Sequence, residues 1–147
     1  MYRLIGDNHA LDGLPYSAQV FLRALDGVRE RLAVAAGVPN TELRALSRVA
    51  EASGIDVSVL VKDLDLSIDA ATRAVNALVE RGLLSELPGG VDGQALELTA
   101  AGHTLIERVY LDFQGSINTA ADSLDDDRRF DFNSALLKMA RKLDEKA

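Results

Sequence analysis

Apolar side chains recur at helical spacing along much of the chain, and each such stripe predicts a helix. The first stripe follows positions i, i+4, i+7 and i+11 and predicts a helix over about 17–36: Phe21, Leu25, Val28 and Leu32. A second, shorter helix is expected after the breakers that end the first, with Asn40 or Thr41 as its cap. A third is expected over about 68–81, because Ser67 is a good N-cap and an apolar stripe follows it.

Two further helices are expected toward the C-terminus. Thr99 caps a long helix that extends to about Ser123, and Asp125 to Asp127 begin the last one. The acidic start and the basic second half of that last helix agree with the helix dipole. The apolar stripe of the helix after Thr99 contains Phe113 and Ile117. The stripe of the last helix contains Phe132, Leu136, Met139 and Leu143.

The stretch IDVSVLVKDLD, residues 55–65, fits two structures. Every second one of its first seven residues is β-branched, and this alternation is typical of a strand. Leu60 and Leu64 lie four apart, however, and Asp56 or Ser58 could cap a short helix. The pattern alone leaves both structures open.

The stretch SELPGGVDGQALELT, residues 85–99, predicts a β-hairpin. Two alternating apolar pieces flank a Pro-Gly-Gly and an Asp-Gly turn cluster. From Gly82 through Glu107 the sequence contains no Lys or Arg. The predicted hairpin therefore carries no positive side chain.

The length and composition of the chain limit the class of protein to which these elements can belong. A chain of 147 residues, 48% apolar and 27% charged, fits a single globular domain over 1–147 with its own core. It has no cysteine, so disulfides and thiolate metal sites are excluded. The N-terminus does not resemble a signal peptide and no long uncharged apolar run is present, so we expect no membrane partner and a cytoplasmic location.

The sequence gives little support to an enzyme. His9 and His103 lack the partners and spacing of a zinc site, and no phosphate-binding glycine loop or nucleophile-elbow motif occurs. The acidic run from Asp125 to Asp127 is explained better by a helix start than by a metal site. We expect no catalytic residue, no cofactor and no bound metal.

Two short helices followed by a hairpin form a winged helix-turn-helix, and here the segments resemble the MarR family of bacterial regulators. The matching segments are LVKDLDLSIDAATRAVNALVERGLL, LELTAAGHTLIERV and LDDDRRFDFNSALLKMARKL, preceded by a leading helix. The resemblance covers roughly 17–143. It implies a mainly α fold with a small β-hairpin wing, in which the winged helix-turn-helix, about 38–99, lies between dimerisation helices at about 17–36 and 100–147. It also favours a helix from Val57 to Asp65.

The resemblance implies that the helix after Ser67 enters the major groove of DNA. Its outward residues are then candidate DNA contacts, together with two arginines of the second helix and one wing residue: Ser67, Asp69, Ala70, Thr72, Arg73, Asn76, Arg44, Arg48 and Gln94. The outward set also includes Ile68 and Ala77. The alternatives are a solvated helix face, and arginines that pair with Glu51 and similar neighbours.

The wing departs from the family pattern. The resemblance predicts Asp-x-Arg near the hairpin tip, whereas this chain has Asp92-Gly93-Gln94. Between Val38 and Thr99 there are five basic and ten acidic residues, a net charge of −5 out of −7 for the whole chain. Because phosphate contacts need cations, we expect weak or conditional DNA binding.

The resemblance also implies a homodimer that binds a pseudo-palindromic double-stranded operator. The candidate dimer contacts are Phe21, Leu25, Phe113, Ile117, Phe132, Leu136 and Leu143. Relatives in the family often release DNA when a small aromatic ligand binds between the dimer helices and the winged domain, a cleft that Tyr16, Tyr110 and Phe113 could line. The predicted function is a transcriptional regulator; the alternative is a winged-helix dimer that has lost DNA binding and serves protein contact or ligand capture.

Overall fold

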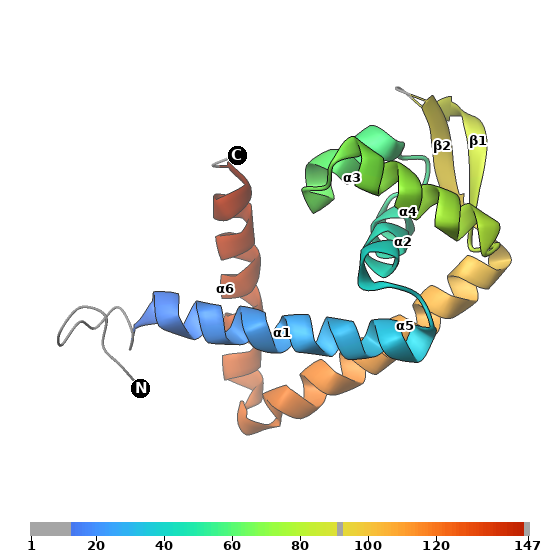
Figure 1. Cartoon of the computed structure of the whole chain (residues 1–147). Helices are drawn as coiled ribbons and strands as arrows, with labels where there is room; N and C mark the ends of the chain where they lie inside the picture. Colours follow the sequence, from blue (N-terminus) through green and yellow to red (C-terminus); the bar gives the residue numbers. More distant parts are fainter. Residues whose placement is uncertain (1–12, 91–92, 146–147) are drawn as a thin grey trace, which may run out of the picture. The chain divides into compact units, whose positions relative to one another are not determined.

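The computed structural model describes residues 13–90 and 93–145 (Figure 1). Over these ranges the fold is mainly α with one β-hairpin, as predicted. The elements are α1 (Leu14–Ala36), α2 (Asn40–Glu51), α3 (Val57–Leu64), α4 (Ile68–Glu80), β1 (Leu84–Gly90), β2 (Gly93–Leu98), α5 (Ala100–Ala120), the 3-10 helix η2 (Ala121–Ser123) and α6 (Asp126–Glu145). The chain divides into two compact units, Met1–Phe113 and Gln114–Ala147, and the helix-turn-helix and hairpin belong to the first.

The helix boundaries follow the predictions closely, with one wrong cap. Helix α1 begins at Leu14, a few residues earlier than expected, because Pro15 suits a first helical turn. The N-cap of α2 is Pro39, so the expectation that Asn40 or Thr41 caps this helix was wrong. The Asn40 side-chain oxygen is buried and does not turn back to the first backbone amides.

The ambiguous stretch forms the helix α3. The Asp56 carboxylate, only 3% exposed, accepts hydrogen bonds from the backbone amides of Ser58 and Val59. These bonds help to satisfy amides of the first turn, which lack the usual carbonyl partner four residues earlier in the helix. Leu60 points into the core and is fully buried. An N-cap and a single apolar face therefore outweigh the β-branched alternation.

Helix α4 is capped and packed as its sequence predicts. The Ser67 hydroxyl oxygen accepts a hydrogen bond from the Ala70 amide at 3.0 Å. One face of α4 is buried in the main hydrophobic cluster, with neighbours from α2, α3 and both strands: Ala71, Ala74, Val75 and Leu78 with Ala45, Leu46, Val49, Leu60, Leu84 and Leu96. Burial of this face leaves the opposite face of α4 in solvent.

The hairpin is attached to the helix-turn-helix through its second strand. β1 and β2 are antiparallel, with Leu84 opposite Leu98 and an irregular register between Leu87 and Gly90. In β2, the Leu96 amide donates to the Ile55 carbonyl at 2.7 Å, and the Leu96 carbonyl accepts from the Gly54 amide at 2.9 Å. The link between α2 and α3 thus pairs with the wing, and the wing is fixed at its base.

A second attachment joins the end of α4 to the start of α5. The Thr99 hydroxyl donates to the Gly82 carbonyl at 2.6 Å and accepts from the Gly102 amide at 3.0 Å, so Thr99 caps α5 as predicted. A Cβ atom at Gly102 would lie 2.1 Å from the Leu83 carbonyl oxygen. Only glycine allows this approach, which positions α5 against the strand that follows α4.

In the second unit, α6 begins where the acidic run predicts. The Asp125 carboxylate accepts a hydrogen bond from the Arg128 amide at 2.9 Å, and Asp126 and Asp127 occupy the first turn. Helix α6 buries none of its residues. None of the helices in the described ranges combines the length and the apolar character needed to cross a bilayer.

Candidate nucleic-acid interface

The candidate DNA-reading surface is the solvent-facing side of α4. In Figure 1, α4 lies between α3 and the β1–β2 hairpin, in contact with both. Its predicted outward residues are exposed except for two half-buried alanines, Ala70 and Ala77. The exposed ones are Ser67, Ile68, Asp69, Thr72, Arg73 and Asn76. The structure therefore brings the α4 candidates to one surface.

Helical spacing arranges this surface in two rows. Ile68, Thr72 and Asn76 follow one another at intervals of four residues, and Asp69 and Arg73 form the adjacent row. Within the described ranges, no ion pair involves Arg73. Its guanidinium group is therefore available for a phosphate or a guanine edge.

The two α2 arginines make contacts within the protein. Arg44 donates from Nη2 to the Leu64 carbonyl at 3.1 Å. Arg48 forms an ion pair with Asp63, with Nη2 at 2.8 Å and Nε at 2.9 Å from the carboxylate. Both arginines thus hold the C-terminal end of α3 against α2, and the acidic partner is Asp63. DNA contact by either residue stays a prediction, and it would compete with these bonds.

Internal pairing reduces the positive charge available to DNA. Arg81, at the end of α4, is paired with Glu42 of α2 at 2.9 Å. Among the five basic residues between Val38 and Thr99, the structure shows ion pairs or hydrogen bonds for three. In the described part of the chain, Lys62 and Arg73 are the two without such partners.

The wing adds no positive charge to this surface. Gln94 is exposed, and Asp92 lies outside the described residues. Glu86 is exposed on β1, and Glu97 on β2 accepts a weak bond from the Ser53 hydroxyl at 3.4 Å. The described part of the hairpin is therefore negative, whereas α4 combines Arg73 with Asp69.

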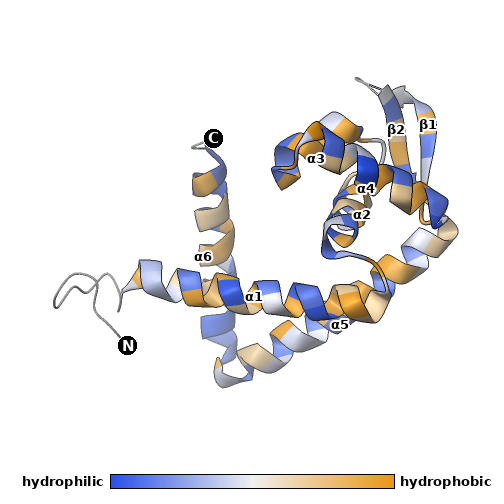
Figure 2. Cartoon of the chain, viewed as in Figure 1, coloured by the Kyte–Doolittle hydropathy of each residue, from blue (hydrophilic) through white to orange (hydrophobic). Residues whose placement is uncertain are grey.

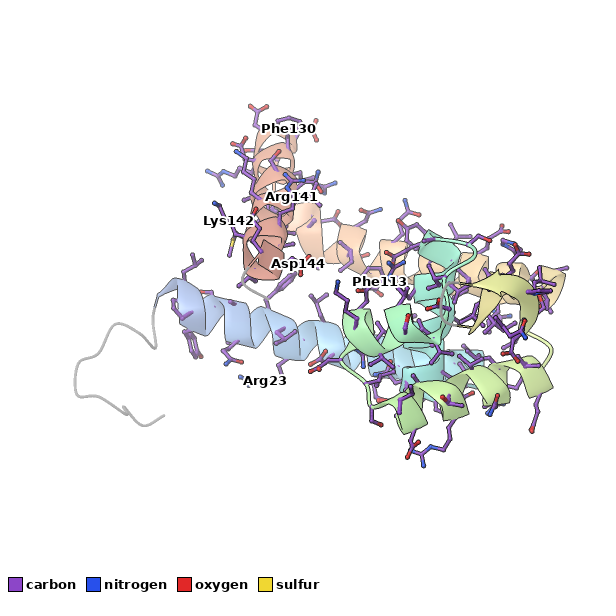
Figure 3. All side chains as sticks on the ribbon, turned by 90° about the horizontal axis from the view of Figure 1, so that it is seen from above. Arg23, Phe113, Phe130, Arg141, Lys142 and Asp144 are labelled. Carbon is purple, nitrogen blue, oxygen red and sulfur yellow. The ribbon has the colours of Figure 1, made fainter. Side chains whose placement is uncertain are left out.

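A cavity of about 600 Å³ lies within the first unit. Its wall combines apolar side chains of α1, α2 and α5 with three arginines, and Arg44 and Arg48 are among them. Of the aromatic candidates, Tyr110 and Phe113 line the cavity (Phe113 is labelled in Figure 3). Tyr16 does not, because it lies about 20 Å along α1 from Arg29, the nearest lining residue of that helix.

The cavity also contains a polar atom that sequence reasoning missed. The Asn40 side-chain oxygen is buried and has no hydrogen-bond partner among the described residues. Asn40 lines the cavity, so a donor placed there could satisfy it. The sequence suggested only a helix cap at this position, since the packing of α1 and α5 over α2 is a tertiary property.

The candidate dimer residues lie on helices with exposed apolar positions. Figure 2 shows hydrophobic positions along α1 and α6, interspersed with hydrophilic ones. Phe21, Phe132, Leu136 and Leu143 are exposed, and Leu25, Phe113 and Ile117 are half-buried. Phe130, labelled in Figure 3, is a further exposed aromatic residue of α6, with 71% of its surface in solvent. The apolar stripe predicted from the sequence does not include it.

The arrangement of α2, α3, α4 and the hairpin defines a winged helix-turn-helix protein. Comparison with solved structures found a MarR family protein from Bacillus stearothermophilus with a TM-score of 0.83 at 17% identity, covering 92% of this chain and 96% of that one. A MarR family transcriptional regulator from Silicibacter pomeroyi has a TM-score of 0.76 at 21% identity, covering 93% and 94%.

A third similar structure was solved with nucleic acid. It is a MarR family transcriptional regulator from Listeria monocytogenes complexed with 26mer DNA, with a TM-score of 0.77 at 20% identity, covering 91% of each chain. No protein-family model matches this chain, and no curated protein sequence matches it. The chain thus has the MarR-type winged helix-turn-helix fold. The neighbours from Silicibacter pomeroyi and Listeria monocytogenes are both described as transcriptional regulators.

Proposed function

We propose that this protein is a transcriptional regulator that binds double-stranded DNA as a homodimer. The observation that carries the proposal is the solvent-facing side of α4, where Arg73, Thr72 and Asn76 are exposed at helical spacing. The inward side of the same helix is fully used by the core, so this side is presented rigidly. The solved DNA complex of a structural neighbour supports the use of this fold on DNA. A DNA-binding regulator implies a cytoplasmic location.

The small number of unpaired basic residues in the winged segment supports a modest affinity for DNA, with few phosphate contacts. If only Lys62 and Arg73 of each protomer met phosphates, a dimer would make four such contacts. The log–log slope of affinity against salt would then be about −3.6, from about 0.9 per contact. Sequence discrimination would have to come largely from base contacts rather than from charge.

The apolar stripes support the homodimer. Helix α6 places Phe132, Leu136, Met139 and Leu143 on one side, and it buries none of them within the chain. A stripe of this kind on a surface helix normally packs against another element. A two-fold dimer would cover it with a second copy and would pair two α4 helices for two half-sites.

The cavity supports control by a small ligand. Its apolar wall suits an aromatic ring, and the unsatisfied Asn40 oxygen suits a donor such as a phenolic hydroxyl group. Arg44 and Arg48 line the cavity and also bind the end of α3. A ligand that attracts either arginine would loosen α3, on which α4 rests. Addition of such a phenol should then release bound DNA in a mobility-shift titration, and unchanged binding would contradict ligand control.

The direct test is an electrophoretic mobility shift with DNA from upstream of the gene, at low salt. We expect a shifted band that survives an excess of random-sequence duplex. The acidic winged segment favours the rival function, a winged-helix dimer that acts without DNA. A dimer that shifts neither the upstream fragment nor any duplex from a randomised pool would establish the rival.

A further inference from the structure

Ile68 is the first residue of α4 and lies at the exposed end of the proposed DNA-reading surface. Its exposed fraction is 66%. It lies outside the hydrophobic cluster that contains the buried side of the same helix. Helical spacing puts Ile68 in one row with Thr72 and Asn76, so the row presents an aliphatic group, a hydroxyl group and an amide in that order.

The fold does not require an isoleucine here. Leu66, just before the N-cap, is the residue that packs against the cluster at this end of α4. A β-branched residue is also a mediocre helix former. Single exposed apolar residues are common on protein surfaces. This one, however, occupies the N-terminal end of a recognition helix, where side chains meet base edges in the major groove.

The major groove offers one apolar group at base edges, the C5 methyl group of thymine. We propose that Ile68 recognises this thymine methyl group and is a specificity-determining residue of the DNA-reading surface. The inference rests on the proposed DNA-binding function. It fits the scarcity of free cations near α4, because an apolar contact discriminates without any positive charge.

The test begins with a DNA probe selected by the protein itself. Repeated selection from a randomised duplex pool yields the preferred site. This site is then synthesised in two forms, one with thymidine and one with deoxyuridine at the position of the selected thymine. Deoxyuridine pairs like thymidine and lacks only the methyl group. We expect the wild type to bind the deoxyuridine duplex about fourfold more weakly for each methyl contact, hence about fifteenfold for two half-sites. This ratio should stay constant as salt concentration changes.

Two variants assign the effect to the side chain. Ile68→Ala should bind the two duplexes nearly equally, because the shortened side chain no longer reaches the thymine methyl group. Val34→Ala is the matched control. Val34 is 77% exposed on α1, about 180° around the helix from Leu25 of the dimer stripe, and this variant should keep the wild-type ratio. Circular dichroism checks that both variants are folded.

The outcomes separate the inference from the proposed function. Equal binding of both duplexes by the wild type, or an Ile68→Ala variant that keeps the ratio, would overturn the role of Ile68 and leave DNA binding intact. Selected sites without an invariant thymine would do the same. If selection enriches no duplex, the proposed function fails and the inference fails with it.

Discussion

At the scale of single residues, the DNA binding proposed for α4 depends on which positively charged side chains are not already paired within the protein. Arg44, Arg48 and Arg81 are used to hold α2, α3 and α4 together. Internal pairs at a protein surface add little stability each, but they fix side chains in one geometry. The same pairs withdraw positive charge from a segment that is already acidic. For the proposed DNA binding, Arg73 is therefore one of the two basic residues in the described part of this segment that have no partner within the protein.

We predict that Arg73→Ala weakens DNA binding. A base contact would cost about 1–3 kcal/mol on the selected site, whereas a phosphate contact would lower affinity by a similar factor on every sequence. Fluorescence anisotropy with selected and random duplexes distinguishes the two. Arg23→Ala removes the same charge from the exposed surface of α1 and should bind normally. Unchanged affinity of Arg73→Ala for both duplexes would remove Arg73 from the interface.

Gly102 sets a second prediction at this scale, on stability. A methyl group there would lie 2.1 Å from the Leu83 carbonyl oxygen, so the junction of β1 and α5 must shift. We expect Gly102→Ala to destabilise the fold by about 1–3 kcal/mol, the usual range for overpacking. Gly115→Ala in the same helix meets no atom within 4 Å and should stabilise it by about 1 kcal/mol. Denaturant unfolding measures the free energy of unfolding of both variants. Equal stability of Gly102→Ala and Gly115→Ala would refute the close approach of Gly102 to the Leu83 carbonyl group.

At the scale of elements, local signals predicted more than tertiary ones. Ser67 and Thr99 cap the helices that the sequence assigns to them, because a cap needs only the next three residues. For residues 55–65 the local signals disagreed, and the family resemblance favoured the helix that Asp56 caps. The arginine contacts with Asp63 and Leu64, and the cavity oxygen of Asn40, involve residues far apart in sequence. Short-range sequence patterns do not predict such contacts.

The wing illustrates an element whose fold is maintained without positive charge. Its base is fixed by the hydrogen bonds between Leu96 and residues 54 and 55 and by the burial of Leu84 and Leu96. None of these contacts needs a cation at the tip. The hairpin can therefore complete the core of the winged domain whether or not its tip meets DNA.

We predict that Gln94→Arg strengthens DNA binding if the wing lies along the duplex. Two added cations in a dimer would steepen the log–log salt slope by about 1.8. Gly93 is a poorer site, since its φ of 150° disfavours any side chain. Gln19→Arg adds the same charge on α1, opposite the dimer stripe, and should leave the slope near its wild-type value. A folded Gln94→Arg variant with wild-type affinity and slope would mean that the wing does not face DNA.

At the scale of the whole molecule, part of the apolar surface of the helices is not buried within the chain. The core of the winged domain is complete within the first unit, with residues of α2, α3, α4 and the hairpin. Helix α6, in the second unit, has twenty residues and none of them is buried. Most of the stability of a helix in a protein comes from the packing of its apolar face, so the exposed stripe of α6 favours an apolar partner. The proposed homodimer would supply one, because a second copy of the chain carries the same stripe.

We predict that the wild type sediments as a dimer at micromolar concentration and that Leu136→Asp shifts it toward monomer. Burying an unpaired carboxylate costs on the order of several kcal/mol, which would raise the dimer dissociation constant by a factor of hundreds or more. Asn133→Asp adds the same charge to α6 beside the stripe without removing an apolar group, and it should remain dimeric. Because a monomer presents one α4 helix instead of two, Leu136→Asp should also lose most of its affinity for a two-half-site duplex. A wild-type monomer that is fully folded would contradict the dimer, and the apolar stripe of α6 would then require a different partner.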